Sequence, residues 1–489
     1  RYFKKRKKKI MISNKSIHMS NEEFREYGYA VIDWIVDYYD NIENYSVKSN
    51  VKPGEVISNF QKDPPVDGES IKFLLEDIDR LIIPGITHWQ SPKFFGYFPA
   101  NTSGPSILAD LISSSLGVNG MVWETSPACT ELEIHVLDWL AQMLLLPEHF
   151  LSDKNGGGVI QDTASSASLC ALIAAREKKT KGKSNLFGSK ENLVAYASSE
   201  THSSIEKAAM IAGIGSKNIR KIDVNDDFSM NIDLLKKQII KDIKEGYTPF
   251  FVCATIGTTS SNAIDSLYKI GKISNQYKLW MHVDAAMAGT AAICPEYRYM
   301  HKGLEYAESY LFNPHKWMLT NFDCSCLFIK NKKDLISALS IMPEYLKTDT
   351  SNKDDVIDYR DWQIPLGRRF RSLKLWAVIR YYGVNGLQNY IRNHIALTHK
   401  FLSWVINDEN FEVIAPAPFN LVCFRAKGSN KLNERLLRFI NNSGEIFITH
   451  TKLNDLYTLR FCVGQTHTDI EHIKLAWESI KNGLKKIKE

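Results

Sequence analysis

The amino-acid sequence predicts an α/β fold whose large domain is built on a mainly parallel β-sheet. The first observation is that short apolar stretches alternate with helical stretches from about residue 100 to 390. The second is that this rhythm changes at about residue 396, which indicates a separate, smaller domain. Buried strands that are separated by helices are typical of parallel sheets. The candidate strands of the large domain are 159–161, 193–196, 250–253, 280–283, 310–312 and 326–329.

An amphipathic helix is predicted near the N-terminus. Ser20 and Glu23 have the spacing of a capping box, and apolar residues follow at helical intervals. Those apolar residues are Phe24, Tyr27, Val31, Ile35 and Tyr38. Pro53, Pro64 and Pro65 then indicate an extended connector. A helix that packs on a partner subunit and a helix that packs on its own domain would both have this pattern.

The C-terminal part is predicted to form a smaller α+β domain. Strand-like runs at 420–424 and 457–461 are flanked by helical stretches, and a basic helix is expected at 469–488. The expected organisation is therefore a basic disordered leader, a helical arm, a large domain and a small domain. Their expected bounds are 1–18, 19–99, 100–395 and 396–489.

The positive net charge comes from the first ten residues. They carry seven positive charges, so the formal charge of +6 becomes −1 without them. A disordered or non-native leader is expected there, and a polybasic contact with nucleic acid or a membrane is the alternative. Because the positive charge is confined to these ten residues, we expect no nucleic acid as partner. Because no apolar run has the length of a membrane span, we expect no membrane as partner either. The eight scattered cysteines favour buried thiols in a reducing cytoplasm and no metal site.

Two residues near predicted strand ends point to pyridoxal phosphate chemistry. Asp284 ends the run 279–284, and Lys316 lies about thirty residues later, in a turn that follows the strand-like run 308–312. A lysine amine forms the Schiff base with this cofactor, and an acidic residue keeps the pyridine nitrogen protonated. A solvated surface lysine is the alternative, and the apolar neighbours argue against it. Those neighbours are Phe312, Trp317 and Met318.

Other residues near strand ends fit the same cofactor. Thr163 and Ala164 lie between a strand and the helix predicted at 169–177, where free backbone N–H groups form a phosphate site. His202 follows the next strand, at the edge where ligands of open α/β sheets bind, and its ring is placed to stack on the cofactor. Thr259 follows the third strand and is placed to contact the ring or to brace the carboxylate. Taken alone, these features are a helix cap, a surface histidine and a turn.

A polar segment after residue 347 is predicted to form a mobile lid, and disorder is the alternative. Tyr345 at its edge is placed to deliver a proton, although packing is the commoner role of a loop tyrosine. Gly367 leaves space where any side chain would narrow a pocket. The arginines that follow this glycine are expected to form mostly structural ion pairs. They are Arg368, Arg369 and Arg371.

Taken together, these residues closely resemble the group II pyridoxal phosphate decarboxylases, in particular the aromatic-L-amino-acid decarboxylase branch. The similarity runs from about Ser20 to near the C-terminus. The matching stretches are 86–89, 94–99, 126–133, 282–286, 313–317 and 362–371. The resemblance implies fold type I, with seven strands in the large domain and an N-terminal arm that packs on the partner subunit. It also implies a homodimer with shared active sites.

The resemblance assigns roles to matching positions. It implies that Lys316 forms the Schiff base and that Asp284 pairs with the pyridine nitrogen. It also implies that His202 stacks on one face of the ring and that Ala286 lies against the other. The residues that resemble the remaining cofactor contacts of the family are Thr163, Ala164, Thr259, Asn313 and His315. Those that would line the substrate pocket, some of them across the dimer, are Trp89, Tyr97, Phe98 and Met121.

The activity that the resemblance implies is the decarboxylation of aromatic L-amino acids to aryl alkyl amines and carbon dioxide. Tyr345 matches the residue that protonates the α-carbon. Relatives that make aromatic aldehydes have phenylalanine at this position, so an aldehyde synthase is the alternative. Gly367 matches a glycine of indole-accepting relatives, which favours L-tryptophan, with tyrosine, dopa and phenylalanine as further candidates.

Overall fold

The computed structural model describes residues 18–341 and 356–489. The chain divides into two compact units, and the boundary lies between His88 and Trp89. The leader expected at 1–18 lies outside the described residues except for its last position. The lid segment and Tyr345 also lie outside them.

The N-terminal unit is built around the predicted amphipathic helix, α1 (Asn21–Asp40). The capping box is confirmed, because the Glu23 backbone N–H donates to Ser20 Oγ and the Ser20 N–H donates to the Glu23 carboxylate. Trp34 Nε1 donates to Asp79 Oδ1 at 2.9 Å, which ties α1 to the later part of this unit. None of the α1 residues is buried. The other α-helices of this unit are α2 (Glu55–Ser58) and α3 (Ile71–Asp77).

The second unit contains the predicted seven-stranded sheet, with the order β1-β7-β6-β5-β4-β2-β3. The strands from β3 through β2, β4 and β5 to β6 pair in parallel, and β7 runs antiparallel to both β6 and β1. The prediction of a mainly parallel sheet is therefore confirmed. The strands are β1 (Gly157–Gln161), β2 (Leu193–Ser198), β3 (Ile219–Ile222), β4 (Thr248–Thr255), β5 (Trp280–Asp284), β6 (Ser309–Phe312) and β7 (Ser325–Ile329).

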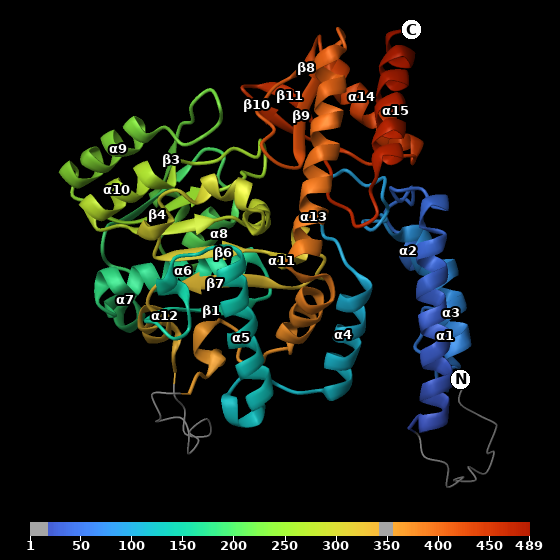
Figure 1. Ribbon diagram of the computed structural model, residues 1–489, viewed down its shortest axis with the longest axis horizontal. Coiled ribbons are helices and arrows are strands. Elements are labelled where there is room, and N and C mark those ends of the chain that lie inside the picture. Colours follow the sequence, from blue (N-terminus) through green and yellow to red (C-terminus); the bar gives the residue numbers. More distant parts are fainter. Residues whose placement is uncertain (1–17, 342–355) are drawn as a thin grey trace, which may run out of the picture. The chain divides into compact units, whose positions relative to one another are not determined.

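Helices cover both faces of this sheet (Figure 1), because successive strand side chains alternate between two apolar cores. One core packs under α6, α8 and α12, and the other packs under α5, α9, α10 and α13. The helices of this part are α4 (Gly104–Leu116), α5 (Pro127–Met143), α6 (Ala164–Thr180), α7 (Lys183–Phe187), α8 (Ser204–Ile211), α9 (Ile232–Lys244), α10 (Leu267–Tyr277), α11 (Pro314–Trp317), α12 (Lys332–Leu339) and α13 (Arg371–Asn407).

The C-terminal part forms the predicted small α+β layer, with an antiparallel sheet in the order β10-β11-β9-β8. Its core includes Phe401 of α13, whose ring stacks on Phe461 with centroids 3.8 Å apart. The strands are β8 (Phe411–Val413), β9 (Leu421–Ala426), β10 (Thr449–Leu453) and β11 (Leu456–Cys462). The helices are α14 (Asn430–Ser443) and α15 (Ile470–Lys488).

The structure differs from the sequence-based expectation in three places. Strand β3 was not predicted, because polar Arg220 and Lys221 interrupt its apolar pattern. Helix α6 begins at Ala164, five residues before the expected start, because Thr163 is its N-cap. The expected boundary at residue 395 lies inside α13, whose only non-helical backbone is at Gly383 (φ 63°).

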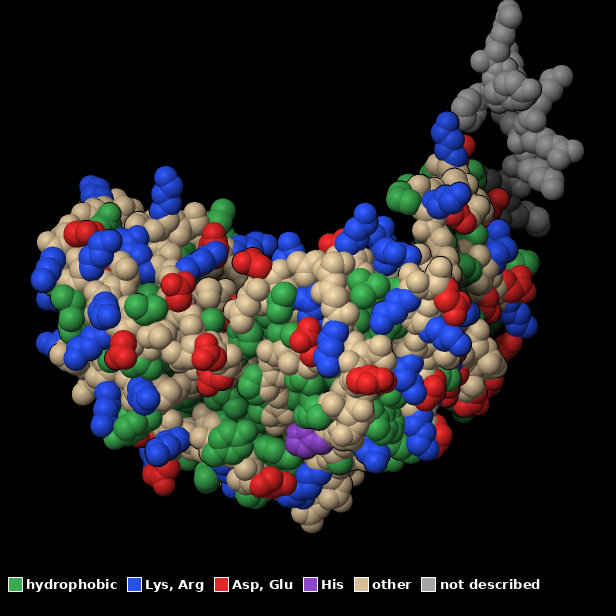
Figure 2. Space-filling model, turned by 90° about the horizontal axis from the view of Figure 1, so that it is seen from above, with side chains coloured by type: hydrophobic (Ala, Val, Ile, Leu, Met, Phe, Trp, Pro, Cys, Tyr) green, Lys and Arg blue, Asp and Glu red, His purple; other side chains and the backbone are tan. Residues whose placement is uncertain are grey.

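The surface and the cysteines agree with the composition. Of the helices in the described part of the chain, none combines the length and the apolar character that a membrane crossing requires. Basic and acidic side chains are interspersed over the face that Figure 2 shows. All eight cysteines are buried free thiols, as predicted.

Four buried histidines make the fold sensitive to acid. Burial lowers the pKa of His282 and His301 to about 4, and that of His315 and His394 to about 3. His394 Nδ1 accepts a hydrogen bond from Trp317 Nε1 at 3.0 Å, which a protonated ring would lose. Since these histidines have an ordinary pKa near 6.5 when unfolded, the unfolded chain binds more protons below that pH. The free energy of unfolding therefore falls as the pH drops from about 6.5 towards the folded pKa values.

We expect His394→Gln to reduce the slope of the free energy of unfolding against pH by about 1.4 kcal/mol per pH unit between pH 5.5 and 4. Glutamine does not titrate, and it keeps an acceptor for the Trp317 hydrogen bond. Urea denaturation at several pH values would measure it. His467→Gln is the matched control, because His467 is exposed. An unchanged slope in His394→Gln would contradict the prediction.

Candidate functional site

The sheet brings Asp284 and the turn that carries Lys316 to the same edge. Strands β5 and β6 pair in parallel, with Asp284 opposite Leu311. The backbone N–H of Asn313 donates to the carbonyl of Ala286 at 2.9 Å, which ties the turns that follow the two strands. Lys316 lies in the short helix α11 that starts one residue later. The predicted lysine and carboxylate therefore lie at the carboxyl ends of neighbouring strands, where open α/β sheets bind ligands.

The Lys316 amine lies in surroundings that disfavour its charge. Its side chain is half-buried, and Nζ lies 5.4 Å from the centre of the Phe98 ring. Burial lowers the pKa of Lys316, Asp284 opposes this shift and Arg460 adds to it. A lowered pKa increases the neutral fraction of the amine, which is the nucleophilic form.

The Asp284 carboxylate is buried, and one of its two oxygens accepts a hydrogen bond from the backbone. Oδ1 accepts a hydrogen bond from the Ala286 backbone N–H at 3.0 Å, which fixes the orientation of the carboxylate. Oδ2 accepts no hydrogen bond from any described residue. A carboxylate with one oriented oxygen and one available oxygen can accept a hydrogen bond from a protonated ring nitrogen.

His202 lies on the open side of the same site. Its Nδ1 accepts a hydrogen bond from the Ser204 backbone N–H at 3.1 Å, so Nε2 carries the proton of the neutral ring. Burial lowers the pKa of His202, the carboxylate of Asp284 opposes this, and the charge of Lys316 adds to it. A ring that is neutral near pH 7 is suited to stacking on an aromatic ligand.

The predicted phosphate residues converge through β1 and β7. The last residue of β1, Gln161, pairs with Ser325, and Ser325 Oγ donates to Asn313 Oδ1 at 2.6 Å. Thr163, two residues after Gln161, caps α6, whose first-turn N–H groups face the same edge. Ala164 is the first residue of this helix. These contacts bring the N-terminus of α6 and the Asn313 side chain to the same edge of the sheet.

His315 directly precedes Lys316 in α11, and its ring is neutral. Its Nδ1 accepts a hydrogen bond from the Cys324 backbone N–H at 2.8 Å. Burial lowers the pKa of His315 to about 3, and the charge of Lys316 adds to the effect. The ring is therefore neutral and carries its proton on Nε2, which can donate to a phosphate oxygen.

Arg460 is a residue of this site that the sequence analysis missed. Its guanidinium is buried, lies 5.4 Å from the centre of the Phe98 ring, and donates to the Thr259 carbonyl at 2.7 Å. Phe98 thus has a cationic group near its ring from both Lys316 and Arg460. The signal in the sequence was a single arginine within the apolar strand run 457–461.

The predicted substrate-pocket residues fall into three places. Phe98 contacts Lys316, as described above. Trp89 and Tyr97 stack on each other with ring centroids 5.4 Å apart, and Tyr97 is 51% exposed. Met121 and Gly367 lie in segments joined by the hydrogen bond from the Gly120 N–H to the Arg368 carbonyl. In the described part of the chain, neither of these last two pairs forms a hydrogen bond or a ring contact with Lys316.

The arginines after Gly367 form ion pairs, as predicted. Arg368 Nη2 lies 2.7 Å from Glu133 Oε1, and both side chains are buried. Arg371 Nε lies 2.8 Å from Asp323 Oδ1. Among the described residues, no cluster of three or more His, Cys, Asp and Glu side chains is placed to hold a metal ion.

The site fits pyridoxal phosphate group by group. A half-buried amine, an oriented carboxylate, a neutral imidazole and a helix N-terminus correspond to the aldehyde, the ring nitrogen, the ring face and the phosphate of this cofactor. Tyr345, the expected proton donor, lies outside the described residues.

Comparisons with known proteins agree with this chemistry. The family model described as "Pyridoxal-dependent decarboxylase conserved domain" matches residues 53–427. Tyrosine decarboxylase 2 of Narcissus pseudonarcissus is 50% identical over 94% of this chain and 93% of its own length. Phenylacetaldehyde synthase of Arabidopsis thaliana is 48% identical over 95% of this chain and 96% of its own length.

A solved structure extends the agreement to the fold. Catharanthus roseus tryptophan decarboxylase in complex with L-tryptophan superposes with a TM-score of 0.91 and 41% identity, over 96% of this chain and 99% of that one. The architecture is thus fold type I, and pyridoxal phosphate is the cofactor. The chain belongs to the pyridoxal-dependent decarboxylase family.

Proposed function

We propose that this enzyme converts aromatic L-amino acids to aryl alkyl amines and carbon dioxide. The observation that carries the proposal is the Lys316 amine, which has a lowered pKa, lies 5.4 Å from the Phe98 ring and shares its sheet edge with Asp284. The relatives named above, a tyrosine and a tryptophan decarboxylase, support an aromatic substrate. The buried free thiols support a reducing compartment, and we propose the cytoplasm as the location.

In the proposed mechanism the side chains hold the cofactor and position protons. Bound pyridoxal phosphate supplies an electron sink for the electrons left when carbon dioxide departs. Asp284 would hold the proton on the pyridine nitrogen, and His202 and Ala286 would confine the two faces of the ring. Lys316 would hold the cofactor through its neutral amine, which is the nucleophilic form. The anion site is formed by the groups that we assign to the phosphate: Thr163, Ala164, Asn313 and His315.

Tyr345 is the residue that we expect to decide whether the product is an amine or an aldehyde. We propose that its hydroxyl protonates the substrate α-carbon after carbon dioxide has departed, so that the amine is released. The alternative function, an aromatic aldehyde synthase, is favoured by the 48% identity to phenylacetaldehyde synthase. The tyrosine argues for simple decarboxylation, because an α-carbon that is protonated quickly has no time to react with oxygen.

We further propose a preference for L-tryptophan, based on space at Gly367. An added Cβ at this position would meet only Asn119 Nδ2, at 3.8 Å, so the backbone leaves room beside the predicted pocket. An indole is larger than a phenol and needs this room. Tyrosine, dopa and phenylalanine are the further candidate substrates.

We propose that the working enzyme is a homodimer with shared active sites. Helix α4 exposes four large apolar side chains, each between 51% and 56% exposed, and such a patch favours a protein partner. They are Leu108, Leu111, Ile112 and Leu116. Within the described residues of one chain, no hydrogen bond or ring contact joins Lys316 to Trp89, Tyr97 or Met121, which supports a role for these three residues in the partner's pocket.

Tyr345→Phe is expected to lower amine formation by at least about 100-fold, because the proton donor is lost. One amino acid, one O2 and one water would then yield one aldehyde, carbon dioxide, ammonia and hydrogen peroxide. Amine, aldehyde and peroxide would be quantified in air for both enzymes. Tyr299→Phe, at a tyrosine that is 58% exposed, is the control. Aldehyde from the unaltered enzyme would overturn the decarboxylase assignment in favour of the synthase.

Gly367→Ser is expected to lower kcat/KM for tryptophan relative to tyrosine by about 10-fold or more, because the added side chain takes space from the larger ring. The ratio would be measured in competition, with both substrates in one reaction. Gly68→Ser is the control, since no atom lies within 4 Å of a Cβ built there. An unchanged ratio would show that Gly367 does not face the substrate.

The dimer is tested at α4. Leu111→Lys combined with Ile112→Lys is expected to give the mass of one 55.8 kDa chain by light scattering, where the unaltered protein gives twice that mass. Leu186→Lys combined with Phe187→Lys, at exposed apolar residues of α7, should leave the mass doubled. A monomeric unaltered protein would rule out the proposed homodimer.

A further inference from the structure

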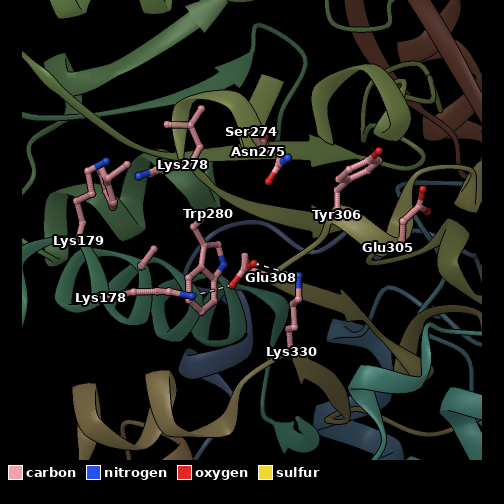
Figure 3. A pocket seen from close by; sticks show the side chains of 13 residues that line it. Lys178, Lys179, Ser274, Asn275, Lys278, Trp280, Glu305, Tyr306, Glu308 and Lys330 are labelled. Atoms are coloured by element: carbon pink, nitrogen blue, oxygen red, sulfur yellow. Dashed lines mark hydrogen bonds and ion pairs between the residues drawn. The ribbon is translucent and has the colours of Figure 1, made fainter. Parts of the chain in front are cut away.

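A second pocket lies at the opposite edge of the large sheet from the cofactor site. It has a volume of about 400 Å³ and is drawn in Figure 3. Its walls come from the C-terminal ends of α6 and α10 and from residues at the starts of β4 and β5, together with Lys330 directly after antiparallel β7. The cofactor site lies past the other ends of β4, β5 and β6, so the two sites are separated by the length of the strands.

An ion-pair network fixes one wall of this pocket. Lys178 Nζ lies 2.9 Å from both Glu308 and Asp334, and Lys330 lies 3.3 Å from Glu308. The same Lys178 ammonium lies 5.3 Å from the centre of the Trp280 ring. These carboxylates are therefore already neutralised by lysines and leave little negative charge for a ligand.

The floor of the pocket is apolar and rigid. Phe250, Leu279 and Trp280 are buried residues that line it, and they belong to the sheet or directly precede it. Trp280 Nε1 donates to Ser309 Oγ at 2.7 Å, which fixes the indole. A flat apolar group would find a preformed surface here.

Two further lysines of the pocket have no partner. The side-chain ammonium groups of Lys179 and Lys278 form no ion pair or hydrogen bond with any described residue, and Figure 3 shows both side chains on the same side of the pocket. Burial lowers the pKa of Lys179, and the charge of Lys278 adds to this effect. Glu305, the one lining carboxylate outside the network, is drawn at the far side of the view. Two facing ammonium groups repel each other, and an anion between them would remove that repulsion.

The negative charge at the nearby helix C-termini does not cancel the attraction of the two lysines for an anion. The C-termini of α6 and α10 each contribute about half a negative charge. Lys179 and Lys278 contribute two full positive charges, so the balance at this end of the pocket is positive.

We propose that this pocket binds a small organic anion, a carboxylate or phosphate on a flat apolar body. Lys179 and Lys278 bind the anionic group, and the apolar part lies against Phe250, Leu279 and Trp280. The volume lies within the range of about 300–1,000 Å³ that is typical of small-molecule sites. This site is distinct from the cofactor site and is independent of the proposed substrate.

The test uses the enzyme loaded with pyridoxal phosphate, so that the cofactor's own phosphate site is filled. Phenyl phosphate, phenylacetate and inorganic phosphate would be titrated separately by calorimetry. We expect one of the two aromatic anions to bind at least about 10-fold more tightly than inorganic phosphate, because only they reach the apolar floor. The one that binds more tightly identifies the anionic group.

Lys179→Gln combined with Lys278→Gln is expected to weaken that binding at least 10-fold, while the absorbance of the bound cofactor shows that the fold is retained. Lys236→Gln combined with Lys237→Gln removes two exposed lysines of α9 and should leave the affinity unchanged. The proposal is overturned if neither aromatic anion binds, if inorganic phosphate binds equally well, or if the two double variants weaken binding equally.

Discussion

The chemistry of this protein depends on holding one amine, Lys316 Nζ, where its positive charge is poorly solvated. Burial lowers the pKa of this group, and the nearby Arg460 acts in the same direction. Asp284 opposes both, so the carboxylate that serves the cofactor ring also limits how far the lysine pKa falls. The centre of the Phe98 ring lies 5.4 Å from each cationic group, and this ring adds no further charge to the site. These opposing effects on the pKa give an amine that is nucleophilic and that is still stabilised, when charged, by the Asp284 carboxylate.

The sheet topology gathers the remaining groups around this amine. Parallel β4, β5 and β6 end at one edge, which places Thr259, Asp284 and the Lys316 turn together. Antiparallel β7 then returns between β6 and β1, and the pairing of Ser325 with Gln161 brings the N-terminus of α6 to the same place. The N-terminus of α6 thereby reaches this edge of the sheet through the short connection between β1 and α6.

Local signals in the sequence were sufficient for the fold class and for placing Lys316 and Asp284 at the same edge of the sheet, because Asp284 ends one apolar strand run and Lys316 lies in the turn after the next one. Strand β3 was missed because an edge strand needs only a partly apolar pattern, and its middle residues are Arg220 and Lys221. The start of α6 was placed too late, since a segment rich in serine and alanine carries little hydrophobic periodicity. Arg460 was missed for a different reason: its contact with Phe98 joins residues far apart in the chain, and no local pattern encodes that contact. The role of Tyr345 rests on the sequence, because this residue lies outside the described part of the chain, and the proposed role of Gly367 rests on the resemblance and on the space beside its backbone.

Strand β5 carries both sites, with Trp280 at one end and Asp284 at the other. At about 3.3 Å per residue, its ends are roughly 13 Å apart. Coupling between two sites requires an element with two alternative arrangements. All five residues of β5 are buried, and the strand is paired on both sides with β4 and β6, so a second arrangement would break backbone hydrogen bonds to both neighbours. An anion in the lysine pocket therefore stabilises the folded state by mass action and leaves the geometry of Asp284 unchanged.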